Sequence, residues 1–514
     1  MPETLKKNKP AFLTLMILAV HSVYIFLLYL QVPLNSDHAN QILQAADILN
    51  GNVLLSGWNL TGVSFYFSEI PFYILGTLFA GIDTWAYIIA AALMVICAAL
   101  AGFCLAVSGK RDQTMPTVLL YLGLTGIPTL TWLGYLRGHC AIFIYFFLIL
   151  LLVQKIYADE GIRTSHWAAF AVLSACGCMS DMQLLIIGLG PLLLFCAGIL
   201  VRNEPRFSWG KTARLAGTAV CGIAAGMAMD AMLMKAGHIN KNGFLETRRF
   251  LDLDRAADKF LLMGKGILNV FRTDIPLSGR GFLTILTAAG ILLTVLFFIV
   301  KVLGRFLRQG DGDPVSVILS ISLLLMLTVC FITDIYTSED SARYIAYFPF
   351  AAGVLICRQI SFKTSRQKVM PVFLFAFVLA ACFHPLQTTR VESPQDRLAD
   401  FLEENGLTYG FSDFWNASHT TVASNDRVRV RSIRVRMPVL NVPAYAEMQN
   451  WFCKTEWYRP EYSNFVAFDG RNYLHVSEEN ISILFGEPDK ILDNGEYRVF
   501  VYYHDITREI MGVK

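Results

Sequence analysis

Residues 11–40 read AFLTLMILAVHSVYIFLLYLQVPLNSDHAN, and the change of character within this stretch decides the fold class. The apolar run from Ala11 to Leu30 has roughly 20 residues, enough for an α-helix to cross the ~30 Å hydrocarbon core of a membrane. No small-x-small cleavage motif follows it, so we expect an uncleaved membrane span rather than a signal peptide. Polar residues come next, and Asp37 lies at the start of the amphipathic helix that residues 39–50 predict.

The composition places most of the chain in the same class. Of the 514 residues, 55% are hydrophobic and 16% are charged, whereas soluble proteins carry about 25% charged residues. This excludes a disordered protein, a coiled coil and a cytosolic enzyme of ordinary composition. A net charge of +3 gives no basis for nucleic acid as a partner. Because the long apolar blocks stop near residue 388, we expect a membrane module over residues 1–390 and a soluble domain over residues 391–514.

The predicted fold class is an α-helical polytopic membrane protein with about 11 transmembrane helices. The candidate spans lie at residues 11–31, 83–107, 114–134, 139–157, 165–181, 183–201, 212–236, 281–303, 315–335, 342–360 and 369–388. Alternate connections are rich in Lys and Arg, whereas residues 32–82 contain neither. Since basic connections face the cytoplasm, we expect a multi-pass protein of the cell membrane with a cytoplasmic N-terminus. Its outer loops would be residues 32–82 and 237–280, and its C-terminal domain would be extracytoplasmic.

The apolar segment from Phe67 to Ala80 is the exception in this topology. Its roughly 14 residues would extend only about 21 Å as a helix. If it crossed the membrane, every later connection would change sides and the basic connections would face outward. We therefore expect a re-entrant or juxtamembrane helix, so that the first outer loop carries juxtamembrane helices.

Six ionisable residues are predicted to share the outer membrane face. They lie at the ends of different spans: Asp37, Glu69, Arg137, His139, Asp181 and Arg343. Ionisable groups near a bilayer are costly, which makes them candidates for function. Structural interpretations stand beside this one, because Asp37 also suits a helix N-cap and Glu69 suits the first turn of a helix dipole. The shared face counts for more than any single residue, so the candidate site is placed there.

The long outer loop contains two amphipathic stretches, at residues 244–252 and 259–267. Two interpretations stay open for them. They form interfacial helices that lie on anionic lipid, or they form a mobile lid that admits an anionic lipid substrate.

The C-terminal region predicts an α+β domain. A helix over Arg397–Asn405 should stop at Gly406. The dipeptide Asn494-Gly495, between the apolar runs 481–485 and 497–503, is typical of a β-hairpin.

Arginines alternate with valines over residues 427–431, which predicts a strand with one basic face. This face is either solvated and protects a sheet edge, or it binds an anionic glycan or lipid headgroup. Most aromatic residues of the domain are expected to lie in its core: Phe414, Trp415, Trp451, Trp457 and Tyr458.

Together these features resemble the C-type (GT-C) membrane glycosyltransferases, which use polyprenyl-phosphate sugars. The resemblance covers the whole chain and is carried by loose motifs. They are Asp37 after the first span, the short helix at 67–80, the Gly138-His139 and Ser180-Asp181 turns, Ser341-Ala342-Arg343-Tyr344, Glu404–Gly410 leading to Asp413–Asn416, and Phe485-Gly486-Glu487-Pro488. The last of these is similar to the tails of uncharacterised bacterial members.

The resemblance implies a hexosyl- or pentosyltransferase that moves a sugar from a polyprenyl-phosphate donor to an acceptor hydroxyl, with inversion at the anomeric carbon. Asp37 matches the catalytic base of the family's first loop, since an alcohol needs a base to attack at neutral pH. Arg343, and after it Arg137, match the side chains that hold the donor phosphate. The expected partners are the lipid donor, a lipid-linked, glycan or protein acceptor, and membrane lipids.

The resemblance gives accessory roles to the remaining candidates. Glu69 would assist catalysis by orienting the acceptor, or would bind a divalent metal ion with His139. His139 and Asp181 would act on the acceptor side. No D-x-D motif follows Asp37, so the need for a divalent metal cofactor stays open.

Two other classes of protein stay open. A polytopic lipid or glycan transporter or flippase would carry charges at mid-membrane and related halves, and Asp230 is the one deep candidate for such a charge. A non-catalytic membrane scaffold for the outer domain predicts that Asp37, Glu69 and Arg343 do not converge.

Overall fold

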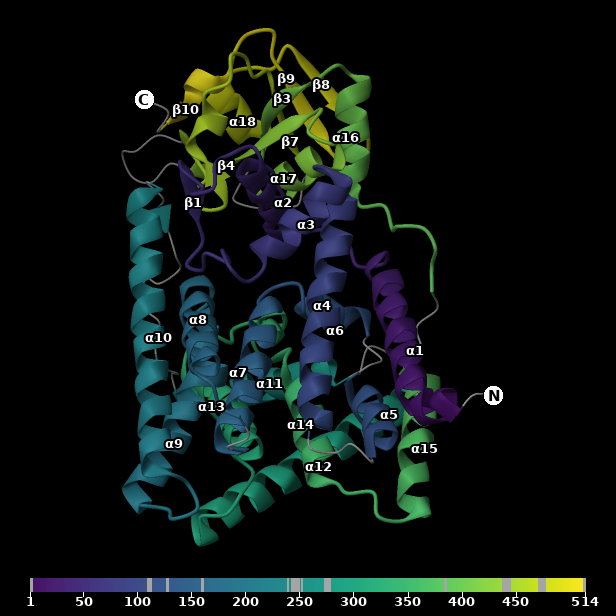
Figure 1. Ribbon diagram of the computed structural model, residues 1–514. Helices are drawn as coiled ribbons and strands as arrows, with labels where there is room; N and C mark the ends of the chain where they lie inside the picture. The colour runs from purple at the N-terminus through teal and green to yellow at the C-terminus, as the bar shows by residue number, and fades with distance from the viewer. Residues whose placement is uncertain are drawn as a thin grey trace.

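The structure is a computed structural model. It describes residues 3–108, 113–125, 129–158, 161–237, 240–241, 250, 253–271, 279–382, 386–436, 445–469 and 478–511. A bundle of helices forms one part of the molecule, and a sheet with flanking helices from the C-terminal region covers one end of the bundle (Figure 1). We call this end of the bundle the sheet end and the opposite end the far end. Of the first amphipathic stretch of the long loop, residues 244–252, all except Phe250 lie outside the described residues.

Within the described ranges, 7 helices are long and apolar enough to cross a membrane. They are α1 (Glu3–Tyr29), α4 (Thr84–Val107), α7 (Ala141–Ala158), the π-helix η2 (Leu185–Leu189) continued by α9 (Gly190–Arg202), α10 (Trp209–Ala236), α12 (Gly279–Gln309) and α13 (Pro314–Ile332). This mostly helical fold is consistent with a polytopic membrane protein, as the composition predicts.

The other four predicted spans form shorter or interrupted helices. They are α5 (Thr114–Thr125) with α6 (Leu130–Tyr135), α8 (Thr164–Ser180), the 3-10 helix η4 (Glu339–Ile345) with α14 (Phe348–Gln359), and α15 (Ser365–Cys382), which contains Pro371. The count of 11 spans therefore stays a prediction.

The first outer loop forms two short helices at the sheet end, α2 (Ser36–Leu49) and α3 (Ile70–Ala80) (Figure 1). α3 has 11 residues, too few to cross a bilayer, as the length of the 67–80 segment predicts. It packs against α2 and α4. A Cβ atom at Gly76 would lie 2.2 Å from the carbonyl oxygen of Ala86. Glycine at position 76 is therefore what allows α3 to approach α4 so closely.

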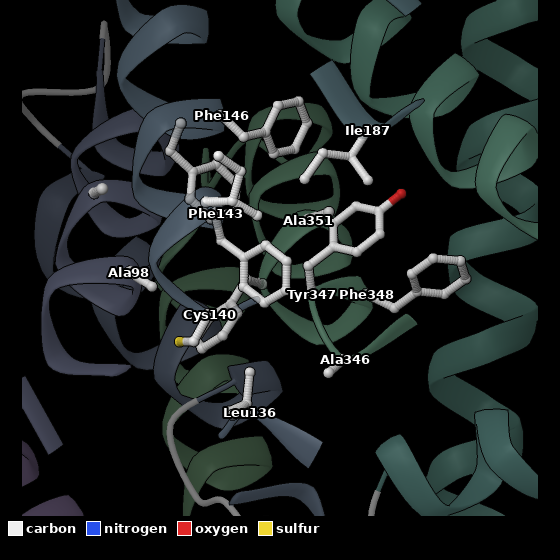
Figure 2. Close-up of a cluster of buried hydrophobic side chains, with 14 of the residues drawn as sticks. Ala98, Leu136, Cys140, Phe143, Phe146, Ile187, Ala346, Tyr347, Phe348 and Ala351 are labelled. Carbon is white, nitrogen blue, oxygen red and sulfur yellow. The ribbon is translucent and has the colours of Figure 1, made fainter. Parts of the chain in front are cut away.

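The core of the bundle is rich in aromatic side chains. Figure 2 shows Phe143 and Phe146 of α7 beside Tyr347, with Ile187 of η2 close to them. The ring centroid of Tyr347 lies 5.6 Å from that of Phe143 and 6.0 Å from that of Phe146. Such contacts add to the burial of large apolar side chains. They hold the start of α7 against the segment that follows η4.

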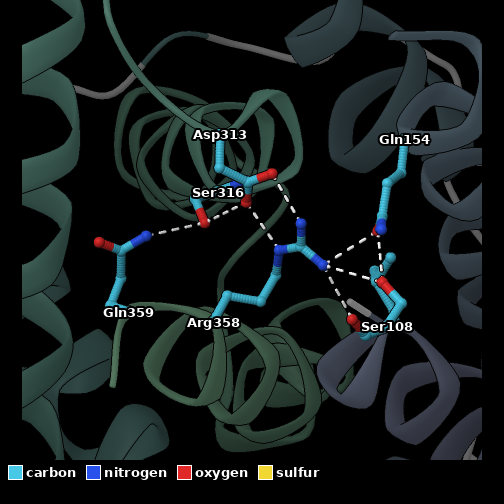
Figure 3. Close-up of polar contacts among 7 residues, drawn as sticks. Ser108, Gln154, Asp313, Ser316, Arg358 and Gln359 are labelled. Atoms are coloured by element: carbon cyan, nitrogen blue, oxygen red, sulfur yellow. Dashed lines mark hydrogen bonds and ion pairs between the residues drawn. The ribbon is translucent and has the colours of Figure 1, made fainter. Parts of the chain in front are cut away.

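Arg358 of α14 joins several helices at the far end. Its guanidinium donates to both carboxylate oxygens of Asp313, each at 2.6 Å, and Asp313 caps α13 (Figure 3). It also donates to the carbonyl oxygen of Leu105 and to the side chains of Ser108 and Gln154, at 3.0–3.2 Å. The ends of α4, α7, α13 and α14 therefore meet at one level, as the predicted alternation of the spans requires.

The C-terminal region forms a seven-stranded sheet in the order β10-β5-β4-β3-β7-β9-β8. Its elements are α16 (Pro394–Glu404), β3 (Tyr409–Ser412), α17 (Phe414–Ala423), β4 (Arg429–Arg436), β5 (Tyr445–Met448), β7 (Phe465–Phe468), α18 (Glu478–Phe485), β8 (Lys490–Asp493), β9 (Arg498–Val501) and β10 (Ile510–Met511). β3 pairs in parallel with β4 and β7, whereas β8 and β9 are antiparallel. A sheet with flanking helices agrees with the predicted α+β class.

Two local predictions for this region are confirmed. α16 ends at Glu404, and Gly406 has a φ of +68°, a conformation that favours glycine at a helix end. Asn494-Gly495 turns β8 into β9, with Gly495 at a φ of +85°. The apolar run 481–485 lies in α18 and is not one of the two hairpin strands.

The prediction of a basic face on residues 427–431 is wrong. Arg429 is exposed, but Arg431 is buried, and its guanidinium carbon lies 4.3 Å from the centroid of a Trp457 ring. The physical reason is that the rings of Trp457 and Tyr409 lie against this part of the face, so only Arg427 and Arg429 are exposed on it. The three arginines therefore do not form one continuous solvated face, and β4, between β3 and β5, is not a sheet edge.

A second, small sheet joins three separate parts of the chain. β1 (Trp58–Leu60) of the first outer loop pairs antiparallel with β6 (Cys453–Lys454) of the C-terminal region. β1 also pairs in parallel with β2 (Asn240–Lys241) of the long loop. Helix α2 packs against α17 in the same part of the molecule. Residues of the segments 32–82 and 237–280 and the C-terminal region therefore build the sheet end together.

Candidate functional site

Asp37 lies in the first turn of α2, but it does not cap the helix. The N-cap is Asn35, whose side chain accepts a hydrogen bond from the backbone N–H of His38 at 3.1 Å. Within the described part of the chain, no group donates a hydrogen bond to the Asp37 carboxylate. The interpretation of Asp37 as a cap is therefore wrong, and the local fold gives its carboxylate no other partner.

Burial and three nearby side chains determine the pKa of the half-buried Asp37 carboxylate. Burial raises its pKa above the ordinary aspartate value, and the charges of Arg343, Arg137 and His139 oppose that rise. The net direction of the pKa is upward. A carboxylate in this setting is a stronger base than an exposed aspartate, and it stands close to two guanidinium groups.

Glu69 is fully buried at the N-cap of α3 without a capping hydrogen bond from its side chain. One carboxylate oxygen accepts from the Ser68 hydroxyl, and the other accepts from the backbone N–H of Ala141 at 3.3 Å. Burial, followed by the charge of Asp181, raises the pKa of Glu69 to about 7. Glu69 therefore ties α3 to the start of α7 and titrates near neutral pH.

His139 and Asp181 form a short ion-pair contact, with Nδ1 of His139 lying 2.5 Å from Oδ2 of Asp181. His139 adopts a φ of +63°, which is unusual for a residue other than glycine. Its ring lies between those of Phe65 and Tyr344, with centroids 5.4 and 5.6 Å away. The other oxygen of Asp181 accepts from the backbone N–H of Gln183. The His139 ring is thus held in one orientation from several sides.

The two candidate phosphate ligands differ in their surroundings. Arg137 donates to the carbonyl oxygens of Gly134 and Pro33, both at 2.9 Å, so its guanidinium holds backbone in place. Arg343 is exposed on η4 and contacts the ring of Tyr344, whose centroid lies 5.2 Å from its guanidinium carbon. In the described ranges neither arginine forms an ion pair with a carboxylate. Arg343 is therefore the better placed of the two to receive an anion.

Helix α11 (Ala256–Val270) lies against η4, the element that carries Arg343. An ion pair between Lys265 and Glu339 joins them. Phe260 and Leu261 of α11 are each 69% exposed. The second amphipathic stretch of the long loop is therefore a helix with an apolar exposed face, and both the lipid-contact and the lid interpretations stay open.

His38 is a buried residue of this region that sequence reasoning did not single out. Its Nδ1 lies 2.9 Å from the Tyr73 hydroxyl and 3.1 Å from Oε1 of Gln41. Burial lowers the pKa of His38 to about 3, so the ring is neutral at physiological pH. It packs α2 onto α3 next to Asp37. The sequence feature that could have identified His38 is its position directly after Asp37.

The described side chains do not fit a divalent metal ion. Among the described residues, no group of three or more His, Cys, Asp or Glu side chains has the geometry to hold one. Both carboxylate oxygens of Glu69 already accept hydrogen bonds, and Nδ1 of His139 faces Asp181. The possible Glu69–His139 metal pair is therefore not supported by the described side chains.

An apolar cavity of about 470 Å³ lies elsewhere, between α5, α12, α14 and α15. Apolar side chains, two threonines and a glycine line it, and none of the six candidate residues does. It therefore contributes no titratable group to the site.

The structure brings the six predicted residues together at the sheet end. The charges of Arg343, Arg137 and His139 act on Asp37, and those of Asp181 and His139 act on Glu69. The fold and the site thus define a mostly helical, apolar chain with a polar cluster at one end of its bundle. No protein-family model matches this chain, and no curated protein matches it.

Proposed function

We propose that this protein is a membrane glycosyltransferase of the GT-C kind, which moves a sugar from a polyprenyl-phosphate donor to an acceptor hydroxyl on the outer face of the cell membrane. The observation that carries the proposal is the Asp37 carboxylate. It has no structural partner in the described chain, its pKa is raised, and it lies close to the charge of Arg343. A base beside a phosphate-binding cation is what a displacement at a sugar phosphate requires.

In the proposed reaction, Asp37 takes the proton of the acceptor hydroxyl as the acceptor oxygen attacks the anomeric carbon. The new carbon–oxygen bond forms as the bond to the phosphate oxygen breaks, and the electron pair leaves with the lipid phosphate. Arg343 stabilises the extra negative charge on that leaving group through charge-assisted hydrogen bonds. A single displacement of this kind inverts the anomeric carbon.

The other residues take positioning roles in this proposal. Arg137 contributes mainly its charge, because two of its five N–H groups, on Nε and Nη1, fix the guanidinium to backbone carbonyls. Asp181 holds the His139 ring through a contact of 2.5 Å, and the charges of both residues act on Glu69. In this proposal His139, Asp181 and Glu69 orient the acceptor.

The convergence of Asp37 and Arg343 weighs against a purely structural scaffold. A transporter is less favoured because the ionisable cluster lies at one end of the bundle, at the starts of α2, α3 and α7. The proposed orientation places the sheet end outside the cell, since the basic connections then face the cytoplasm.

The test is a transfer assay with purified protein in lipid nanodiscs, radiolabelled polyprenyl-phosphate sugars and a membrane extract as acceptor source. Asp37→Asn keeps the shape of the side chain but removes its basicity, so we expect turnover to fall by about 10²–10⁴-fold. The matched control is Asp400→Asn, an exposed carboxylate on α16 and outside the cluster, which should keep wild-type turnover. Near wild-type turnover in Asp37→Asn would show that Asp37 is not the base.

A further inference from the structure

Trp415 is an exposed aromatic residue in a region whose other large rings are mostly covered. It is 44% exposed, whereas its neighbour Phe414 is 4% exposed and Tyr458 is fully buried. Leaving an indole in water forgoes the favourable burial of a large apolar surface. Trp415 is therefore an exception to the prediction that most aromatic residues of the domain lie in its core, and packing does not explain why it is exposed.

Trp415 stands next to the proposed base in space. Its carbonyl oxygen accepts a hydrogen bond from the hydroxyl of Ser36 at 2.6 Å, and Ser36 immediately precedes Asp37. One turn further along both helices, the Ser418 hydroxyl donates to Oδ1 of Asn40 at 2.9 Å. These two bonds align the first turns of α17 and α2, so the backbone of Trp415 lies beside the helical turn that carries Asp37.

A buried aromatic cluster connects the neighbour of Trp415 to the polar cluster. The ring centroids of Phe414 and Trp415 lie 5.1 Å apart, and those of Phe414 and Trp451 lie 5.9 Å apart. Phe414 shares a buried cluster with Phe65, and the Phe65 ring lies 5.4 Å from that of His139. Trp415 lies at the edge of this cluster, and its exposed ring is a surface open to solvent.

A sugar ring matches this surface chemically. One face of a pyranose presents several C–H groups and is apolar, while its hydroxyl groups project around the rim. Such a face packs against the electron-rich face of an indole. An acceptor held in this way would keep its hydroxyl groups pointing outward, toward groups such as the Asp37 carboxylate.

We propose that Trp415 is the platform of an acceptor subsite that binds a carbohydrate, so that the acceptor is a glycan. This inference rests on the proposed function and narrows it to one acceptor class. The C-terminal region then contributes directly to the active site, and Trp415 determines acceptor specificity without taking part in the proton transfer.

The experiment measures binding rather than transfer, so that its failure is distinct from a failure of the proposed function. Full-length protein in nanodiscs is titrated with maltohexaose, cellohexaose and chitohexaose by calorimetry. We expect saturable binding of at least one hexaose, weakened about tenfold by Trp415→Ala and largely kept by Trp415→Phe.

The matched control is Tyr503→Ala, which removes another exposed ring of the C-terminal region, 74% exposed, and should leave the affinity unchanged. Circular dichroism and the melting temperature of each variant check that it is folded. Unchanged affinity in Trp415→Ala would make Trp415 an ordinary interfacial residue and overturn the proposal. The absence of saturable binding by the wild-type protein to all three hexaoses would overturn it as well, whatever the transfer assay shows.

Discussion

At the scale of single residues, the backbone at the start of α2 decides which of two polar side chains caps the helix. Asp37 and Asn35 are both good N-cap residues, and only the backbone geometry assigns the cap to Asn35. The contact between His139 and Asp181 spans 42 positions of the chain. No local pattern encodes such a contact, because it depends on how two turns between helices come together.

The two arginines should respond differently to removal. In Arg343→Ala we expect the KM for the donor to rise about 10–100-fold, since charged hydrogen bonds to phosphate are worth about 1.5–3 kcal/mol. Arg343→Lys should recover part of this loss, because lysine keeps the charge but not the two-pronged geometry. Arg137→Ala should mainly lower the melting temperature, since Arg137 bonds to backbone carbonyls. Steady-state kinetics with thermal unfolding separates the two effects, and an unchanged donor KM in Arg343→Ala would contradict the phosphate assignment.

Glu69 should make the stability of the protein depend on pH. Its pKa is about 7 in the folded protein and 4.5 as the reference value, so the folded state keeps a proton that the unfolded chain has released. Its contribution is fully present below about pH 4.5 and is lost as the pH rises through about 7, on the order of 3 kcal/mol in all. Glu69→Gln removes this dependence.

The measurement is the melting temperature of both proteins from pH 5 to pH 8. We expect the melting temperature of Glu69→Gln to increase relative to that of the wild type as the pH rises. Glu404→Gln, which changes an exposed carboxylate on α16, should show the same pH dependence as the wild type. A difference between Glu69→Gln and the wild type that does not change with pH would show that the carboxylate is not held protonated.

At the scale of elements, apolar content is easier to predict than helical continuity. The segment 342–360 is apolar from Phe348 to Cys357, yet its first residues lie in the 3-10 helix η4, which leaves α14 only 12 residues. The segment 67–80 forms a short helix of 11 residues, as its length predicts. Hydropathy reports whether a stretch prefers lipid or core, and it does not report where backbone hydrogen bonding changes.

The pairing of Arg358 with Asp313 at the far end gives a prediction about the stability of the protein. Asp313 both caps this helix and receives the Arg358 guanidinium. Burial opposes its ionisation, but the hydrogen bonds from Arg358 and Ser316 outweigh this and lower its pKa. We expect Asp313→Asn to cost about 2–4 kcal/mol because it leaves the largely buried Arg358 without its anion. Asp313→Ala should cost about 1 kcal/mol more, since the cap is lost too.

Thermal unfolding in one detergent provides the comparison, with Asp311→Asn as the control. Asp311 pairs with Arg206 at 2.6 Å, but both side chains are about half exposed, so this pair should be worth less than about 1 kcal/mol. Equal losses of stability in Asp311→Asn and Asp313→Asn would mean that the Arg358–Asp313 pair contributes no more than an ordinary surface ion pair.

At the scale of the whole molecule, the division at residue 390 describes the composition better than it describes the assembly. The β2-β1-β6 sheet is built from strands of 2 or 3 residues that belong to three distant segments. Strands this short leave no periodic signal in the sequence. The membrane module and the C-terminal domain could therefore be predicted separately, whereas their common sheet end could not.

Asp47 is the side chain that tests whether this sheet end behaves as one unit. One of its oxygens accepts from the Trp58 indole at 2.8 Å, and the other lies 3.1 Å from Nζ of Lys454. Asp47 thus links α2, which also carries Asp37, to both β1 and β6.

In Asp47→Ala we expect faster amide hydrogen exchange in α2, β1 and β6 together, with exchange around Asp313 at the far end unchanged. Glu456→Ala is the matched control, because Glu456 pairs with the same lysine but is 76% exposed and should have little effect. If exchange rises in β1 and β6 while α2 stays protected, the helix of the proposed base is held by the bundle alone. If all three elements loosen together and transfer falls with them, the C-terminal region is part of what positions Asp37.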